Sequence, residues 1–221
     1  MTETAGGWPR RIFDVSCRDC PRLASFLDEV KARHPDYHCR PVAPFGDARA
    51  RLLIVGLAPG MHGANRTGRP FTGDYAGILL YETLHRHGLA TRPVSVSADD
   101  GLELIDCRIS NAVKCLPPQN KPDTGEIRQC NHYLATEIAE LLPPGGVVLA
   151  LGRIAHDAVL RARGLKVSAC RFAHGAVHEL DGLTLVDSYH ASRYNTQTRR
   201  LTEQMFDDVV GKAASLARGE R

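Results

Sequence analysis

The chain has 221 residues, which suits one large domain or two small ones, and 43% hydrophobic with 24% charged residues allows a sizeable core. No apolar run approaches the roughly 18 residues of a membrane span, and the N-terminus lacks the apolar stretch of a signal peptide, so we expect a cytoplasmic protein. The net charge of +3 is too small to indicate a nucleic-acid partner by itself.

The first part of the chain predicts a tail, a helix, a loop and a buried strand. Residues 1–11 form the expected N-terminal tail. Residues 21–31 predict a helix because apolar residues recur at the spacing of one helix face. Residues 34–50 contain prolines without periodicity and predict a long loop. The apolar run 52–57 ends at a Gly/Pro turn, which is typical of a strand buried on both faces of a parallel sheet.

Strands and helices alternate through the rest of the chain. Asp74 has the position of an N-cap, and the helix expected after it is residues 76–87. Three more helices are expected: one opened by the capping-box-like Asp123-Thr-Gly-Glu126, one from Gly152 to Arg163, and one at residues 198–216. Strands are expected at residues 107–113, 147–151 and 183–187. Without an internal repeat or linker, this order predicts one α/β domain, residues 12–217, with helices on both faces of a parallel sheet.

The segment after the first predicted strand is rich in glycine. It reads GLAPGMHGANRTGRPFTGDYAG and spans residues 56–77. Neither GxGxxG nor GxxxxGK[ST] is present, so the dinucleotide and nucleoside triphosphate motifs are missing. The glycines allow backbone N–H groups to approach a ligand closely. We call this segment the glycine loop.

Polar segments follow all four predicted strands. After the glycine loop, the second strand ends near Asn111 and continues into residues 114–120, the third ends at Gly152, and the fourth continues into residues 188–195. Ligands of parallel α/β sheets bind outside the carboxyl ends of the strands. We therefore expect one active-site crevice at this edge rather than four unrelated turns.

The glycine loop combines residue types that suit a flat, polar ligand. Arg66 and Arg69 can meet phosphates, Phe71 offers a flat face, and Asp74 is the only carboxylate. These features are typical of a nucleobase site. The alternative is that Phe71 belongs to the core and that Asp74 only caps its helix.

Seven cysteines in a chain expected to be cytoplasmic indicate metal binding rather than disulfides. Cys17 and Cys20 form a C-x2-C pair, and Cys115 and Cys130 form a C-x14-C pair. Four sulfur ligands can bind Zn²⁺ or an iron–sulfur cluster, and the spacing leaves both open. The other cysteines are expected to be structural, namely Cys39, Cys107 and Cys170.

Together these motifs resemble the family-5 (type B) uracil-DNA glycosylases, from Cys17 to the final helix. The matching residues are Gly56-Leu-Ala-Pro-Gly60, Gly63, Asn65-Arg-Thr-Gly-Arg69, Phe71-Thr-Gly-Asp74, Gly77, Asn111-Ala-Val-Lys-Cys115-Leu-Pro-Pro and residues 190–195. Sister families carry a polar residue in the first motif, where this chain has Leu57 and Ala58. The last motif begins His-Ala-Ser instead of the common His-Pro-Ser.

The resemblance implies a three-layer α/β/α fold around a four-stranded parallel sheet, with a structural [4Fe-4S] cluster on the four paired cysteines. It implies a monofunctional DNA glycosylase of base excision repair, which hydrolyses the N-glycosidic bond of uracil. Hypoxanthine and xanthine are further expected substrates, because Leu57 and Ala58 suggest a pocket less selective than a strict uracil site. We expect the protein to act as a monomer on double- and single-stranded DNA.

The same resemblance gives roles to individual residues. Asp74 is expected to stabilise the cationic sugar, and His190 to donate a hydrogen bond to the base oxygen. Residues after His190 are expected to enter the duplex once the base has left the stack. Base contacts are expected from Gly56, Ala58, Gly60, Phe71, Asn111, Asn120 and Asn195. Phosphate contacts are expected from Arg66, Arg69, Arg193 and Arg199.

Two other functions are compatible with these residues. A nucleotide or nucleoside hydrolase would use the same base-binding features without contacts to a duplex. An iron–sulfur electron carrier or redox sensor would use the cysteines and leave the crevice without a role.

Overall fold

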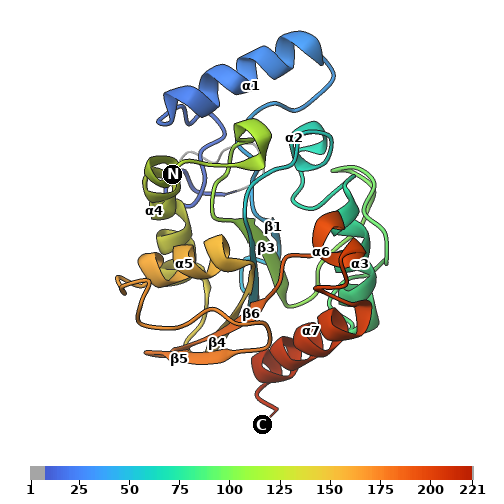
Figure 1. The fold of residues 1–221 in the computed structure, drawn as a ribbon, viewed down its shortest axis with the longest axis vertical. Helices are drawn as coiled ribbons and strands as arrows, with labels where there is room; N and C mark the ends of the chain where they lie inside the picture. The colour runs from blue at the N-terminus through green and yellow to red at the C-terminus, as the bar shows by residue number, and fades with distance from the viewer. Residues whose placement is uncertain (1–7, 221) are drawn as a thin grey trace.

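The computed structural model describes residues 8–220, so residues 1–7 of the expected tail lie outside the described part of the chain. The strands join one six-stranded sheet in the order β1-β3-β2-β4-β6-β5 (Figure 1). The inner four strands are parallel, as predicted from their apolar runs. They are β3 (Cys107–Asn111), β2 (Leu52–Gly56), β4 (Gly146–Leu151) and β6 (Leu183–Ser188).

Two short antiparallel edge strands, which the sequence analysis did not predict, extend this sheet to six. β1 (Phe45–Gly46) pairs with β3, and β5 (Val177–Leu180) pairs with β6. β1 has two residues, too few for a periodic signal, and β5 is largely half-buried. The four-stranded parallel sheet is thus the centre of a mixed sheet.

Helices cover both faces of the sheet and complete the predicted three-layer fold (Figure 1). Leu52 and Ile54 of β2 lie in one apolar cluster with α3 and α7, whereas Leu53 and Val55 lie in another with α4 and α5. This alternation is the one a strand buried on both faces must show. The four helices are α3 (Tyr75–Arg86), α7 (Glu203–Arg218), α4 (Thr124–Leu141) and α5 (Arg153–Ala162).

The predicted helix starts are confirmed at two caps. The Asp74 side chain accepts a hydrogen bond from the Gly77 amide at 2.9 Å and begins α3. Asp123 and Glu126 form the predicted capping box of α4. The first helix, α1 (Pro21–Arg33), also agrees with the prediction and packs through Leu23 against Val113 and Ile127.

The C-terminal helix differs from the prediction of residues 198–216. The chain forms a short helix, α6 (Arg193–Gln197), and then α7 from Glu203. Arg199 has a left-handed backbone with φ of 55°, and the Thr202 hydroxyl accepts a hydrogen bond from the Met205 amide as a new N-cap. In the sequence, the apolar residues of one face of α7 continue at helical spacing into this turn, so the spacing does not reveal the break between α6 and α7.

Three further differences concern the loops and the N-terminus. The short helices α2 (Ala64–Thr67) and η1 (Pro118–Asn120) lie in segments expected to be loops. Residues 8–11 are not a loose tail, because Trp8 is buried and donates to the Pro44 carbonyl at 3.1 Å. Arg11 adds an ion pair to Glu140 at 2.7 Å. Residues 8–11 thus pack against the domain expected at residues 12–217.

A search of the helices in residues 8–220 found none with the length and apolar character needed to cross a membrane.

Candidate active site

One pocket opens where the glycine loop and the segments following β3 and β6 meet. It has a volume of about 410 Å³. We call it the candidate pocket. Its lining residues are Leu57, Ala58, Gly60, Ala64, Phe71, Asp74, Tyr75, Ala76, Asn111, Asn120, His190 and Ser192. Seven of the residues expected to act in catalysis or base binding therefore line one cavity at the carboxyl edge of the sheet.

Asp74 is held in the candidate pocket by both neighbouring segments. One carboxylate oxygen, Oδ1, accepts from the Gly77 amide at the start of α3. The other, Oδ2, lies so close to Gly63 that a Cβ atom there would come within 2.5 Å of it. Burial raises the pKa of Asp74, and the amides of Gly77 and Ala76 oppose that rise by donating to the carboxylate. Asp74 is therefore both a helix cap and a pocket carboxylate.

Phe71 is held in an unusual conformation at the back of the candidate pocket. It is 7% exposed and has a left-handed backbone with φ of 53°. A Cβ atom at Gly56 would come within 2.6 Å of the Phe71 ring, and one at Gly77 within 1.7 Å of the Phe71 carbonyl oxygen. Only glycine at these two positions leaves room for Phe71. Gly56 thus acts by making space, and it lies behind the pocket lining.

His190 lies opposite the glycine loop and stacks on Phe71 with ring centroids 5.9 Å apart. Its Nδ1 atom is buried without a hydrogen-bond partner among the described residues. Burial lowers the pKa of His190 to about 4, so the imidazole is neutral at physiological pH. A neutral imidazole with an unsatisfied nitrogen beside a cavity is a ready hydrogen-bond partner for a ligand.

Two asparagines complete the polar part of the pocket lining. Asn111 ends β3 and is 3% exposed, and its Oδ1 atom lies beside the Cα of Gly56. Asn120 follows Gln119 in η1, and both residues have left-handed backbones with φ near 55°. Asn120 is exposed at the mouth of the pocket, whereas Asn111 lies at its base.

Two residues expected to contact the ligand have other partners in this structure. Asn195 does not line the candidate pocket; its amide donates to the His190 carbonyl at 2.8 Å and fixes the segment after β6. Arg69 is 4% exposed and forms an ion pair with Asp100 at 2.6 Å, with a further hydrogen bond to the Ala98 carbonyl. A guanidinium buried in this way is unavailable to DNA phosphates.

Arg69 also affects its carboxylate partner. Burial alone would raise the pKa of Asp100, but the amides of Val96 and Leu102, together with the Arg69 guanidinium, hold it well below its usual value. This ion pair ties the glycine loop to residues 95–102.

The other three arginines expected to bind DNA are exposed. Arg66 donates to the His62 carbonyl at 2.7 Å from α2. Arg193 lies with its guanidinium carbon 5.2 Å from the centre of the Tyr75 ring. Arg199 lies in the turn between α6 and α7. All three are free to meet solvent or a polyanion.

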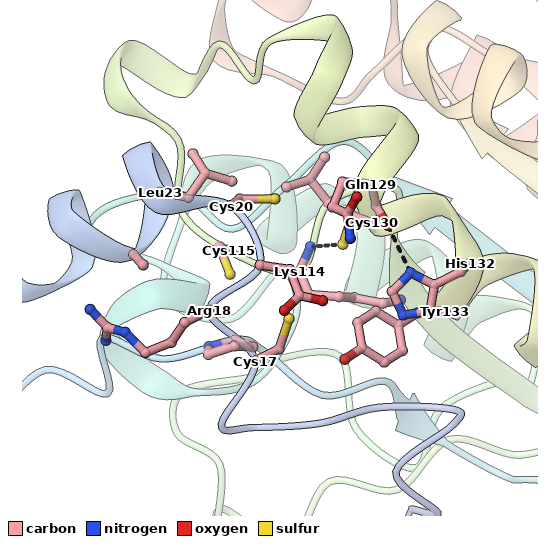
Figure 2. Close-up of a pocket in the computed structure, with 14 residues that line it drawn as sticks. Cys17, Arg18, Cys20, Leu23, Lys114, Cys115, Gln129, Cys130, His132 and Tyr133 are labelled. Atoms are coloured by element: carbon pink, nitrogen blue, oxygen red, sulfur yellow. Dashed lines mark hydrogen bonds between the residues drawn. The ribbon is translucent and has the colours of Figure 1, made fainter.

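The two cysteine pairs meet in a second, narrow pocket. Figure 2 shows the sulfur atoms of Cys17, Cys20, Cys115 and Cys130 turned toward a common space, together with the Lys114 amide, which donates to the Cys130 sulfur at 3.3 Å. Burial, reinforced by the neighbouring thiols, raises the pKa of Cys20 to about 11. Four thiols that line one apolar pocket therefore need a cation to become thiolates together.

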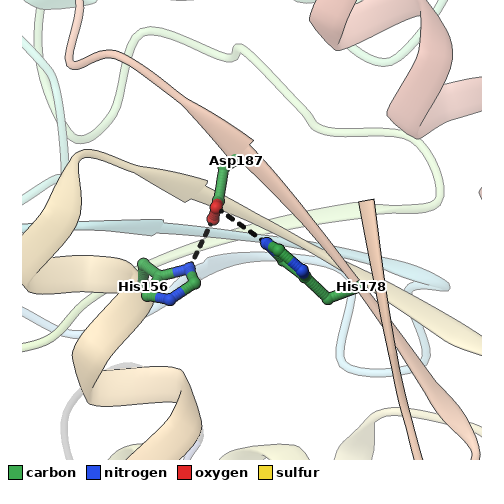
Figure 3. A group of neighbouring side chains, drawn as sticks. All are labelled: His156, His178 and Asp187. Carbon is green, nitrogen blue, oxygen red and sulfur yellow. Dashed lines mark hydrogen bonds and ion pairs between the residues drawn. The ribbon is translucent and has the colours of Figure 1, made fainter. Parts of the chain in front are cut away.

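Sequence reasoning missed a buried cluster of His156, His178 and Asp187, drawn in Figure 3. Asp187 accepts from His156 Nδ1 at 2.7 Å and from His178 Nε2 at 3.1 Å. His156 Nε2 faces the Cys170 carbonyl at 3.2 Å, so both its nitrogens face acceptors and neither offers a lone pair to a metal. The cluster is best explained as a buried ion pair that joins α5, β5 and β6.

Tyr75 is a pocket residue that the sequence analysis did not select. It follows Asp74 directly and is 39% exposed. Its position next to the only carboxylate of the glycine loop was the one feature of the sequence that could have indicated a place in the pocket.

The chain is similar to several known proteins. The model of the family described as the uracil DNA glycosylase superfamily matches residues 43–214. A relative from Thermus thermophilus, named type-5 uracil-DNA glycosylase, is 49% identical over 92% of this chain and 94% of its own length. Proteins of the same name from Pyrobaculum aerophilum and Mycobacterium leprae are 42% and 43% identical, covering 91% and 96% of this chain and 89% and 97% of their own. The resemblance inferred from the glycine loop and the cysteines is thus confirmed, and the chain belongs to the uracil DNA glycosylase superfamily.

Proposed function

We propose that this protein is a monofunctional glycosylase that hydrolyses the N-glycosidic bond of uracil in DNA, as the first step of base excision repair. The observation that carries the proposal is that Asp74 and His190, from distant parts of the sequence, line one cavity together with Phe71 and Asn111. A carboxylate, an imidazole, a flat aromatic face and an amide are the groups that base excision needs in one place.

Base recognition follows from the walls of the candidate pocket. The flipped base stacks on Phe71, and the Asn111 amide pairs with its polar edge. Ala58 and Gly60 bring the backbone of the glycine loop to the base, because neither has a side chain large enough to keep it away. Asn120, at the mouth of the pocket, contacts the base or its sugar from the solvent side.

Bond cleavage leaves a cationic sugar and an anionic base. Asp74, ionised, stabilises the developing positive charge on the sugar and orients the attacking water. His190, neutral, donates to the base oxygen that gains negative charge. Because burial lowers the pKa of His190 to about 4, the imidazole of the free enzyme is uncharged and donates as a neutral group.

We also propose that hypoxanthine and xanthine are substrates. Leu57 and Ala58 put apolar groups on the pocket wall. An apolar wall rejects a larger or differently substituted base less strongly than a hydrogen-bonding wall does, because no buried polar group is left unpaired.

DNA is held through its phosphates by Arg66, Arg193 and Arg199 in this proposal, while residues after His190 fill the space left by the base. No lysine is among the described residues that line the candidate pocket. Lys114, the nearest in sequence to Asn111, is buried and bonded to Ser110 and Glu137. An amine committed in this way supports hydrolysis by water rather than a covalent lysine intermediate with strand cleavage.

We propose a structural [4Fe-4S] cluster on Cys17, Cys20, Cys115 and Cys130. Four sulfur donors in an apolar pocket fit an iron–sulfur cluster. Thiolates around one Zn²⁺, with bonds of about 2.3 Å, lie roughly 4 Å apart. No three of the four sulfurs, all within the described residues, come within 4.8 Å of one another, which supports the larger group. Bound there, the cluster cross-links the N-terminal segment to α4.

In this proposal the active species is a monomer in the cytoplasm. Its domain is residues 12–217, and Trp8 is buried beside it.

The test is excision from oligonucleotides that carry one uracil, hypoxanthine or xanthine, in duplex and single-stranded form, followed by alkali to reveal abasic sites. We expect alkali-dependent strand breaks at each lesion with the wild-type protein and a loss of at least about a hundredfold in Asp74→Asn, which keeps a good N-cap for α3. Strand breaks without alkali would contradict a monofunctional enzyme. Activity only on free deoxyuridine would indicate a nucleoside hydrolase instead.

A further inference from the structure

The short helix α6 stands on the surface without a core of its own. The residues on either side of it, Ala191 and Leu201, are buried at 0% and 1% exposure. None of the α6 residues is buried, and Tyr194 is 70% exposed. The segment is thus a surface arch anchored at both ends, and it directly follows His190 in the sequence.

A cavity lies beneath this arch. It has a volume of about 450 Å³ and lies between α3 and the arch, lined by Tyr75, Ile78 and Glu82 on one side and by Thr196, Arg199 and Leu201 on the other. We call it the α3–α6 hollow. Across a cavity of this size, α6 has no side-chain packing that resists a force directed toward α3.

Tyr75 bridges the α3–α6 hollow. The Thr196 hydroxyl donates to the Tyr75 hydroxyl at 3.2 Å, and the Arg193 guanidinium carbon lies 5.2 Å from the centre of the Tyr75 ring. These two contacts are made by the first and fourth residues of α6. The same tyrosine follows Asp74 and lines the candidate pocket. In Figure 1, α6 lies beside the start of α3, as these contacts require.

We propose that Tyr75 is a positioning residue, which supports α6 while the residues after His190 occupy the place of the extruded base. The inference rests on the proposed function. A DNA duplex resists the opening of its stack, and the segment that enters it must withstand the same force. Tyr75 transmits that force to α3, whose start is fixed by the Asp74 cap. Arg193 is also held in place, so its contact with a phosphate requires less ordering on binding.

This role separates duplex from single-stranded substrates. A uracil in a single strand needs no replacement in a stack, so its excision does not depend on the support of α6. We expect Tyr75→Ala to lower the single-turnover rate on duplex uracil about tenfold, the size expected for losing one hydrogen bond and one cation–π contact. Because Tyr75 also lines the candidate pocket, the measure is the ratio of the duplex rate to the rate on the same oligonucleotide as a single strand, which should fall about fivefold or more.

Two conservative variants test the hydrogen bond between Tyr75 and Thr196 separately from the ring contact with Arg193. Tyr75→Phe keeps the ring under Arg193, and Thr196→Val removes the hydroxyl from the other partner. Each should lower the duplex rate about threefold. The Thr196 hydroxyl also contacts the Ser192 and Arg193 carbonyls, so the double variant should fall no further than Thr196→Val alone, which already removes the hydrogen bond to Tyr75. Ile78→Ala, which removes an exposed apolar side chain from the same hollow, is the matched control and should behave as wild type.

Equal losses on duplex and single strands in Tyr75→Ala would overturn the inference, because they would show that Tyr75 shapes the pocket or the fold. An unchanged duplex rate would overturn it as well. A wild-type protein inactive on both substrates would instead contradict the proposed function. In that case the fluorescence of 2-aminopurine beside the duplex uracil still reports opening of the stack, which must weaken in Tyr75→Ala for the inference to stand.

Discussion

Gly63 and Asp74 lie in direct contact, so close that a Cβ atom at Gly63 would come 2.5 Å from Asp74 Oδ2 and 2.7 Å from Asp74 Cβ. The space beside the carboxylate therefore leaves no room for a side chain at Gly63. The position of the proposed catalytic carboxylate is therefore set by a residue that carries no chemistry.

Gly63→Ala should displace the Asp74 carboxylate and lower uracil excision by about 10- to 100-fold, because misplacing a reacting group by about 1 Å can have that effect. Gly125→Ala is the matched control. Gly125 lies in α4, where an added Cβ meets nothing within 4 Å, so its activity should equal wild type. Single-turnover rates on one uracil duplex decide the matter. A fully active Gly63→Ala would show that Asp74 tolerates displacement.

The pH dependence of excision should lack a transition near 6.5, the usual pKa of histidine. Burial lowers the pKa of His190 to about 4, so His190 is already neutral at pH 6. Excision should fall only at lower pH, where His190 gains a proton and Asp74, whose pKa is raised by burial, is neutralised. The measurements are single-turnover rates from pH 4 to 8 and an NMR titration of the His190 ring in the free protein. An inflection near 6.5 in that titration would contradict a buried neutral imidazole.

The same shift has a consequence for stability. The unfolded chain binds a proton at His190 near pH 6.5, whereas the folded chain binds it near 4. Between these values the unfolded state holds more protons, so His190 makes the free energy of unfolding decrease as the pH falls. His190→Gln should remove this contribution, giving a flatter dependence of the melting temperature on pH in that window.

Arg66 and Arg69, three residues apart, should give opposite results on substitution. Arg66→Ala should weaken binding to any duplex and reduce the slope of log K against log salt by about one, because it removes one phosphate contact. Arg69→Ala should leave that slope unchanged and destabilise the fold by about 1.5–3 kcal/mol, because it removes the guanidinium from the half-buried Asp100, which keeps only the amides around it. Anisotropy titrations over a range of salt concentrations and thermal denaturation separate the two effects. A reduced salt slope in Arg69→Ala would show that the buried ion pair opens on DNA.

Removing one thiol should remove the proposed cluster and the stability it provides. Cys130→Ser should lose bound iron, lose the broad absorption of the iron–sulfur chromophore and melt at a lower temperature, because the N-terminal segment is no longer cross-linked to α4. Cys170→Ser, outside the four-cysteine pocket, is the control and should retain its iron. Stoichiometric zinc in anaerobically purified wild-type protein would contradict the cluster. Excision should fall with cluster loss, since Ala58 of the candidate pocket packs against the same apolar cluster of residues as the four cysteines.

The sequence alone determined the layers of this fold. The four inner strands are short runs in which every residue but Thr184 is buried, and such runs are typical of a parallel sheet covered on both faces. Asp74 and Asp123 predicted the starts of α3 and α4, because an N-cap side chain accepts hydrogen bonds from amides of the first turn, which are close to it in sequence. The gathering of polar segments at one edge followed from the direction of the strands.

Only the tertiary structure decided which neighbours the polar side chains have. Arg66 and Arg69 look alike in the sequence, yet Asp100, from a segment 31 residues away, takes Arg69 out of solvent. Asn195 was expected to face a ligand and instead holds the His190 carbonyl. Burial patterns and helix caps arise from residues close in the chain, so the sequence reveals them directly. The partner of a guanidinium or an amide depends on which distant segments meet, and that information appears only when the chain has folded.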